Sequence, residues 1–253
     1  MRKRIAGGAR RSWALGAALV AAAATVARAQ GTGNGYLFGQ PSATLTIRGG
    51  WSHANASSDL FEQTTSEFNV NRSDFSGPTF GGQLGIWISP QLDASLDVAY
   101  AGVSRRTHYR NFVDNNNQEI EQTTTLQRVP VTANVRLYLA PRGRSIGTLA
   151  FIPARIVPWV GAGAGATWYR FKQTGDFIDM TSGVVSPDSF ETSTWGPAVQ
   201  GMGGVDLTIT PRIALTGDAR YLWSHAEVSG DFEGYNKIDL SGASFTLGVT
   251  FRL

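Results

Sequence analysis

The chain closes on a strict two-residue alternation of apolar and polar side chains. In the segment ASFTLGVTFRL, residues 243–253, small or polar residues separate the large apolar ones. A period of two places successive side chains on opposite faces of a β-strand. The apolar set is Phe245, Leu247, Val249, Phe251 and Leu253. This segment is therefore predicted to be a strand with one apolar face and one polar face.

The same alternation recurs in six further segments of the chain. They span residues 43–52, 80–88, 92–100, 129–139, 195–209 and 213–223. The facing of an eighth segment, residues 157–171, stays open because small residues occupy both of its faces. Its alternative outward sets are Val160, Ala162, Ala164 and Trp168, or Trp159, Thr167 and Tyr169. Eight such segments predict an all-β chain.

Charged side chains recur at mid-strand on the polar faces. A soluble two-sheet sandwich would leave them in water, whereas a closed barrel would enclose them in its lumen. An unpaired charge in a low-dielectric lumen is costly, so we expect the basic and acidic members to pair. The predicted lumen charge network consists of Arg48, Asp93, Asp97, Arg136, Asp206, Asp218, Arg220 and Arg252.

The connections between the predicted strands are short at one end and long at the other. Residues 88–92 and 209–213 predict tight turns. The long polar connections are residues 55–76, 110–122, 175–193 and 227–239. Transmembrane barrels have this asymmetry, and aromatic residues near their strand ends form interfacial girdles. The predicted aromatic girdle consists of Trp51, Tyr100, Trp159, Trp168, Trp195, Tyr221, Trp223 and Phe251.

One hairpin unit is repeated within the chain. ISPQLDASLDVAY, residues 88–100, aligns with ITPRIALTGDARY, residues 209–221. A sheet in hydrocarbon must close on itself, because every backbone N–H and C=O needs a partner. The sequence therefore predicts a closed antiparallel up-and-down transmembrane β-barrel of eight strands. Residues 140–155 are long for a turn and could hold another hairpin, which would make ten strands.

Residues 1–29 are predicted to be a cleaved secretory signal peptide. A basic start precedes an apolar run that ends at Ala27-Arg28-Ala29, a cleavage signature. We expect a short lead-in over residues 30–41 and the outer-membrane barrel over residues 42–253.

The net charge of the mature chain carries no sign of a nucleic-acid partner. Six of the 22 basic residues and none of the 19 acidic residues lie before Gln30. Removal of those six leaves 16 basic residues and a net charge of about −3, which does not favour binding to nucleic acid. The chain has no Cys, which excludes disulfides and thiolate chemistry.

These patterns together resemble the small bacterial outer-membrane β-barrel family, which includes the OmpA membrane domain, OmpX and OmpW. The resemblance covers residues 40–253 and implies a bacterial outer-membrane location. It also implies outer-membrane lipid, lipopolysaccharide and the barrel-assembly machinery as partners, a monomer, and an extracellular ligand bound through the loops as a further option. The C-terminal strand resembles the family's assembly signal, with Leu253 where Phe is commonest.

Glycines and histidines are the remaining candidates for chemistry. The segment GAGAGA, residues 161–166, superficially fits a dinucleotide fingerprint, but a helix should follow such a motif and a strand pattern follows here. We expect no cofactor and no metal. The only histidines, His53, His108 and His225, fall near loop-side strand ends and are expected to be solvated. His225 with Glu227 is the first choice if a rim active site exists.

The lumen and the loops then define the functional options. An eight-stranded barrel is too narrow for an open pore and fills with side chains. The loop over residues 57–75 carries aromatics that are expected to fold over the barrel mouth. The prediction is a protein without enzymatic activity that has a structural or surface-interaction role in the cell envelope. The alternatives are a narrow channel for small or hydrophobic solutes, as in OmpW, and a rim-located outer-membrane protease or acyltransferase.

Overall fold

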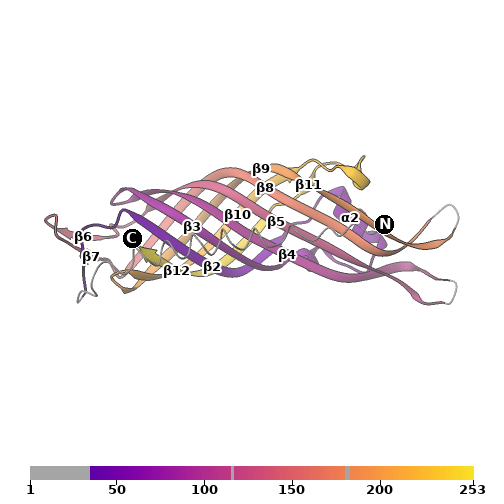
Figure 1. Ribbon diagram of the computed structural model, residues 1–253, viewed down its shortest axis with the longest axis horizontal. Helices are drawn as coiled ribbons and strands as arrows, with labels where there is room; N and C mark the ends of the chain where they lie inside the picture. Colours follow the sequence, from indigo (N-terminus) through magenta and orange to yellow (C-terminus); the bar gives the residue numbers. More distant parts are fainter. Residues whose placement is uncertain (1–34, 115–116, 180–182) are drawn as a thin grey trace, which may run out of the picture.

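Eight antiparallel strands close into a hydrogen-bonded ring in the computed structural model, which describes residues 35–114, 117–179 and 183–253 (Figure 1). The expected signal peptide, residues 1–29, lies outside the described residues. In ring order the wall strands are β2 (Ala43–Ala54), β3 (Gly77–Ser89), β4 (Leu92–Val113), β5 (Glu119–Tyr138), β8 (Ile156–Ile178), β9 (Val185–Thr210), β10 (Ile213–Ala226) and β12 (Gly242–Arg252). Neighbours in the ring follow one another along the chain, which confirms the predicted up-and-down barrel.

The last strand closes the ring against the first. β12 pairs with β2 from Gly242 opposite Ala54 to Arg252 opposite Thr44. Beyond the ladder, the Leu253 amide donates to the Ala43 carbonyl at 2.9 Å. The wall consequently has no free edge, which is the condition for a sheet to exist in hydrocarbon.

The alternation of the sequence becomes an apolar outside and a polar inside. On β12, Leu247 is 76% exposed, whereas Thr246 beside it is 5% exposed. The same division holds on the other wall strands, whose outward apolar side chains form one continuous band around the barrel. A soluble protein would bury such a band, so lipid must cover it.

The facing of β8 is now settled, and it corrects one predicted girdle residue. Val160 is outward and 45% exposed, while Trp159 and Tyr169 are buried inside the barrel. Trp159 therefore does not belong to the aromatic girdle. The indole of Trp159 donates to Asp206 at 3.2 Å. The ring fits because Gly204 has no side chain: a Cβ on Gly204 would lie 2.6 Å from the ring.

The segment after β5 contains a hairpin, but the barrel still has eight strands. β6 (Gly143–Ile146) and β7 (Ala150–Pro153) pair with each other, and β7 also pairs with β1 (Leu37–Phe38). These short strands form a separate three-stranded sheet at the end of the barrel that carries the tight turns. We call that end the turn end and the opposite end the loop end.

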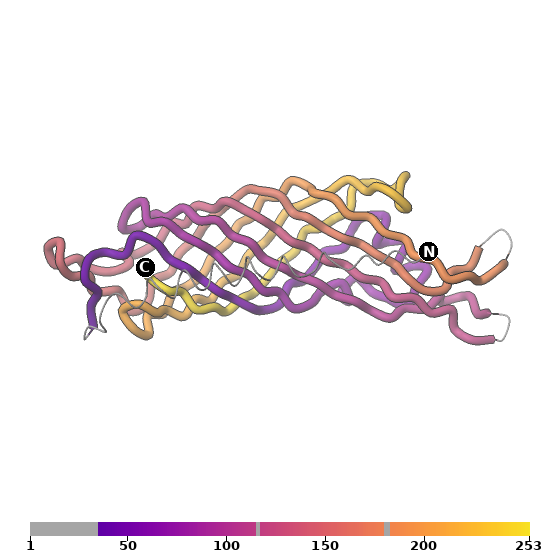
Figure 2. Tube along the Cα trace, viewed as in Figure 1, coloured from indigo at the N-terminus to yellow at the C-terminus, as the bar shows by residue number. Residues whose placement is uncertain are grey.

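Four neighbouring wall strands are much longer than a membrane requires. β4, β5, β8 and β9 contain 22, 20, 23 and 26 residues, whereas the other four contain between 11 and 14. About 9–11 residues suffice to cross a bilayer. The long strands therefore project beyond the loop end as two tall hairpins (Figure 2). The predicted loops over residues 110–122 and 175–193 are largely wrong, because both are mostly strand.

Inward and outward side chains continue to alternate in these projections, but here the outward face is polar. On the outward face of β5, apolar residues run from Leu137 to Val129, and polar residues run from Gln127 to Glu119. On the inward face of the projection, Leu126 and Ile120 are buried, with the polar Gln122 and Thr124 between them. The change from Val129 to Gln127 marks the membrane boundary on this strand.

Two connections at the loop end fill the space enclosed by the projecting strands. The first contains helix α2 (Asp59–Glu67) and the 3-10 helix η1 (Arg72–Phe75), and the second contains η2 (Gly230–Phe232) and β11 (Ile238–Asp239). Among the described residues, no helix is long and apolar enough to cross a membrane. We call residues 55–76 and 227–241 together the plug.

A pair of substitutions on β9 tests the membrane boundary. Val199 faces outward within the apolar band, and Ser189 faces outward on the same strand beyond the boundary. Val199→Arg should lower the free energy of unfolding by about 2–4 kcal/mol, because it places a charge in lipid. Ser189→Arg should change it by less than about 0.5 kcal/mol. Urea titration in lipid vesicles measures both values, and equal costs would show that the boundary is misplaced.

Candidate functional site in the lumen and at the barrel mouth

Asp97 is the centre of an ion-pair cluster that crosses the lumen. Its carboxylate accepts two hydrogen bonds from Arg48, at 2.6 and 2.7 Å, and one from Arg220 at 2.9 Å. Arg220 also donates to Asp218 at 2.7 Å. Arg220 lies on β10 and Asp97 on β4, which stand on opposite sides of the eight-stranded ring. This bond therefore links the two walls directly across the barrel.

A second cluster fills the lumen near the turn end. Asp93 accepts two hydrogen bonds from Arg136, at 2.9 and 2.7 Å, and one from the Tyr138 hydroxyl at 3.0 Å. Arg142 reaches in from beside the β6–β7 hairpin, with its guanidinium 3.4 Å from Asp93 and 3.5 Å from the centroid of the Trp87 ring. The connection between β5 and the hairpin thus contributes a cation that helps to close this end of the barrel.

Two of the predicted lumen charges are held differently from the expectation. We expected Arg252 to pair with a carboxylate, but it donates to the Thr208 hydroxyl at 2.7 Å and to the Pro211 carbonyl at 3.1 Å. Asp206 accepts from Trp159 and, at 2.8 Å, from the Thr216 hydroxyl. Arg252 lies at the end of its strand, where carbonyl groups of the neighbouring turn are within reach.

The space left between these groups is small. A cavity of about 50 Å³ lies beside Arg48, Asp97 and Arg220. That volume can hold a few water molecules at most. On one side of it, Gln200 donates to Thr132 at 2.7 Å and to Asn134 at 2.6 Å, which fixes another polar layer across the wall. The side chains of these groups therefore fill most of the lumen around the central cluster.

Hydrogen bonds fasten the plug onto the loop end of this lumen. Arg128 on β5 donates to the Leu240 carbonyl at 3.0 Å. Asp239 accepts hydrogen bonds from the Ser57 hydroxyl and the Ser241 amide, so that one carboxylate joins both halves of the plug. Burial alone would raise the pKa of Asp239, but these hydrogen bonds outweigh burial and hold its pKa below the ordinary value.

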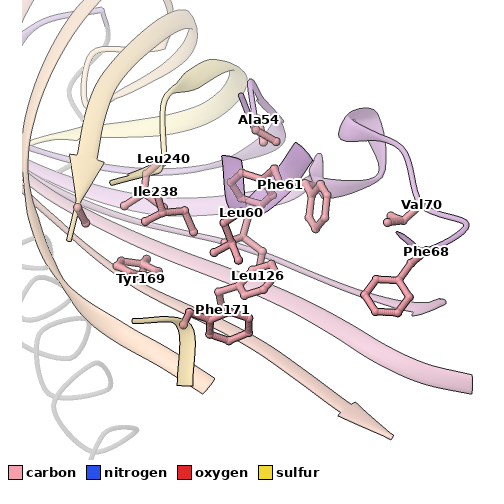
Figure 3. Close-up of a cluster of buried hydrophobic side chains, with 14 of the residues drawn as sticks. Ala54, Leu60, Phe61, Phe68, Val70, Leu126, Tyr169, Phe171, Ile238 and Leu240 are labelled. Atoms are coloured by element: carbon pink, nitrogen blue, oxygen red, sulfur yellow. The ribbon is translucent and has the colours of Figure 1, made fainter. Parts of the chain in front are cut away.

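An apolar core lies between the plug and the inner faces of the projecting strands (Figure 3). Leu60 and Phe61 of α2 are its centre, at 2% and 0% exposed. The Phe61 ring lies 4.8 Å from that of Phe75 and 5.8 Å from that of Phe171, in edge-to-face geometry. The aromatics of residues 57–75 therefore cover the barrel mouth, as the sequence predicted.

The three histidines at the rim contact different partners. His53 lies 3.0 Å from the Ser76 hydroxyl, and within the described part of the chain no carboxylate pairs with His53. His225 lies 3.6 Å from Asp239, while Glu227 pairs with Lys237 at 3.0 Å. The pairing of His225 with Glu227 is therefore wrong. His108 lies 3.3 Å from Glu119 on the exposed surface.

Among the described residues, no group of three His, Cys, Asp or Glu side chains is close enough to hold a metal ion. The glycines of residues 161–166 lie within β8, and no helix follows them. They allow close pairing with β5, where a Cβ on Gly165 would lie 2.0 Å from the Val131 carbonyl oxygen.

Large aromatics lie outward around the boundary at the loop end. Trp51, Trp195 and Trp223 are 53%, 56% and 53% exposed, and Tyr100 is 44% exposed. Trp168 lies directly opposite Trp195 in the β8–β9 pair. The remaining predicted girdle residues, Tyr221 and Phe251, are half-buried on the same outward face.

Several groups that fill the barrel escaped the sequence analysis. Arg128, Tyr138 and Arg142 are buried and bonded inside it, yet they were not among the predicted lumen residues. Arg128 and Tyr138 do carry a signal, because both occupy polar-face positions of the β5 alternation. Arg142 carries none, since it lies in a connection whose path depends on the folded hairpin.

Comparison with known proteins gives likenesses of fold only. No family model matches the chain, and no curated protein matches it. Among solved structures it is similar to the outer membrane protein OprG from Pseudomonas aeruginosa, with 15% identity, a TM-score of 0.47, and 85% of this chain and 98% of that one covered. Neisserial surface protein A is 14% identical, with a TM-score of 0.44, and 87% of this chain and 98% of that one are covered. Outer membrane protein W of E. coli is 16% identical, with a TM-score of 0.39, and 85% of this chain and 100% of that one are covered. The closed ring and the lipid-facing band of this chain themselves have the architecture of a small bacterial outer-membrane β-barrel.

Proposed function

We propose that this protein is a non-conducting outer-membrane barrel whose role is structural or lies in surface interaction through its loop end. The observation that carries the proposal is the bond between Arg220 and Asp97, which joins opposite walls across the lumen. A channel would have to break this buried cluster and move the plug. Removal of one partner from a buried ion pair typically costs about 3–5 kcal/mol, so such an opening is unfavourable.

The loop end supports the surface-interaction part of the proposal. Long connections of outer-membrane barrels face the outside of the cell, so the projecting strands and the plug would face outward there. Their outer surfaces are polar, with Arg106, Glu121 and Thr174 exposed to water. Aromatic packing under the plug keeps this surface ordered, which favours a defined binding face over a mobile loop.

The two alternative functions have less support. A channel for small or hydrophobic solutes needs a continuous path, and the two ion-pair clusters and the plug occupy the lumen one after another. A rim protease or acyltransferase needs a base oriented by an acid. The pair of His53 and Ser76 lacks that acid among the described residues, and Ser76 is 4% exposed, which restricts access to its hydroxyl. His225 lies 3.6 Å from Asp239, but hydrogen bonds from Ser57 and Ser241 already hold that carboxylate in the plug.

Electrical recording tests the closed lumen. The purified protein, inserted into planar bilayers, should carry no steady ion current, because its ion-pair clusters and its plug both obstruct the path. A variant lacking residues 57–75 serves as a comparison, and it too should stay closed because the clusters below the plug remain. Steady single-channel current from the intact protein would overturn the proposal and favour the channel.

A carboxylate substitution tests whether the central cluster holds the walls together. Asp97→Ala leaves Arg48 and Arg220 buried without their shared partner and should lower the free energy of unfolding by about 3–5 kcal/mol. The matched control is Glu62→Ala, which breaks an exposed pair with Arg72 at 2.9 Å and should cost at most about 1 kcal/mol. Urea unfolding followed by Trp fluorescence measures both. Similar costs for the two variants would mean that the cluster does not brace the barrel.

A further inference from the structure

A cleft of about 260 Å³ opens at the loop end between the plug and the projecting strands. It lies beside the apolar core and above the lumen. Six of its lining side chains are aromatic, and they come from the residue after α2, the projecting strands and the η2 connection. They are Phe68, Tyr109, Phe177, Phe190, Phe232 and Tyr235.

The aromatic walls of this cleft are held by contacts among the rings themselves. The rings of Phe177 and Phe190 lie 4.8 Å apart in edge-to-face geometry, and Phe190 is 6.3 Å from Phe232. Phe232 is in turn 6.3 Å from Tyr235. Such pairs restrict the side chains, so the walls are formed before any ligand arrives.

The charged side chains that line the cleft are all acidic. Glu67 and Asp231 are its charged residues, and Lys, Arg and His are missing from the described lining. Glu67 accepts a hydrogen bond from Gln63 at 2.9 Å, and Asp231 accepts one from the Glu191 amide at 2.9 Å. Neither carboxylate faces a cationic partner among the described residues.

The negative charge of Glu67 affects the pKa of two tyrosines in the lining. Burial raises the pKa of Tyr109, and the nearby charge of Glu67 raises it further. Burial and Glu67 act in the same direction on the pKa of Tyr235. Glu67 therefore lies close enough to both tyrosines to place a negative charge on the α2 side of the cleft, where it would attract a cation.

One buried polar group in the lining lacks a partner. Gln173 is 5% exposed, and its amide nitrogen has no hydrogen-bond acceptor within the described chain. A buried donor without a partner is unfavourable, and native proteins seldom keep one without reason. A water molecule, or an acceptor atom on the body of a ligand apart from its charged group, would satisfy it.

We infer that this cleft binds a small organic cation whose charged group is attached to an apolar or ring-containing body. Aromatic faces attract cations through their quadrupole, most strongly where water is excluded. Glu67 and Asp231 would neutralise the charge, while Leu60 and Ile178 would contact the apolar body. An anion would be repelled by both carboxylates, and a neutral hydrocarbon would gain nothing from them.

This inference goes beyond the proposed function and does not depend on whether the lumen conducts. The cleft lies outside the membrane band, and none of its lining residues belongs to the two ion-pair clusters. Binding in the cleft and closure of the lumen can therefore be tested separately, and failure of one leaves the other standing.

The test compares a cation with its neutral isostere. Benzyltrimethylammonium and neopentylbenzene have the same shape and differ in the charge of one atom. The protein is held in nanodiscs of phosphatidylglycerol, because choline lipids and detergents would themselves supply a quaternary ammonium. NMR signals of ring-labelled Tyr109 and Tyr235 report binding at the cleft itself. We expect the cation to shift both signals in a saturable manner and the isostere to leave them unchanged.

Substitution of the carboxylates completes the test. Glu67→Gln with Asp231→Asn should weaken binding of the cation by about tenfold, because two partly exposed charge pairs of modest strength are lost together. Glu119→Gln, on the outer surface of β5, is the matched control and should have no effect. Retention of the heat-modifiable gel shift shows that each variant is folded. No binding, or equal binding of cation and isostere that the double variant leaves intact, would overturn the inference.

Discussion

The structure depends on one constraint, that no backbone hydrogen-bonding group may remain unpaired in lipid. The β12–β2 ladder meets this constraint by pairing the last wall strand with the first. A closed wall then has an outside covered by lipid and an inside too narrow to stay empty, and strict alternation of side chains follows. Charges such as Arg48 and Asp97 are tolerated inside because they meet there, with Arg220 completing the contact from the opposite wall.

How far the sequence could predict this structure depends on how local each feature is. Period-two patterning is local, so it correctly gave the strands and the inward facing of Asp97 and Arg220. Their contact is not local, because 123 residues separate them and it exists only once the ring order is known. Trp159 was misplaced for a related reason. Its neighbours on β8 are small on both faces, and the space that admits its indole comes from Gly204 on the next strand.

The projecting hairpins were predicted as loops because the search looked for strands that are apolar outside. An apolar outer face is expected only where the wall lies in lipid. On β5 that part of the strand ends between Val129 and Gln127. Beyond this point the same strand stands in water and needs the opposite pattern, with Ile120 and Leu126 inside. The opposite pattern is incomplete, because Gln122 and Thr124 also lie inside, so the strand is harder to recognise there. The plug itself could not be placed this way, since its position depends on packing against Phe171 and other distant residues.

The projection also explains why a cleft exists beside the plug. Half of the ring is tall and the other half is short, so the inner face of the tall half must be covered by something other than wall strands. α2 and η2 cover most of this inner face, and the cleft lies at the edge of the covered part. Phe232 belongs to both regions, with its ring 5.4 Å from Phe171 in the core and 6.3 Å from Phe190 in the cleft. A ligand in the cleft would therefore stabilise the packed arrangement of the plug by mass action, because it binds only where Phe232 is in place.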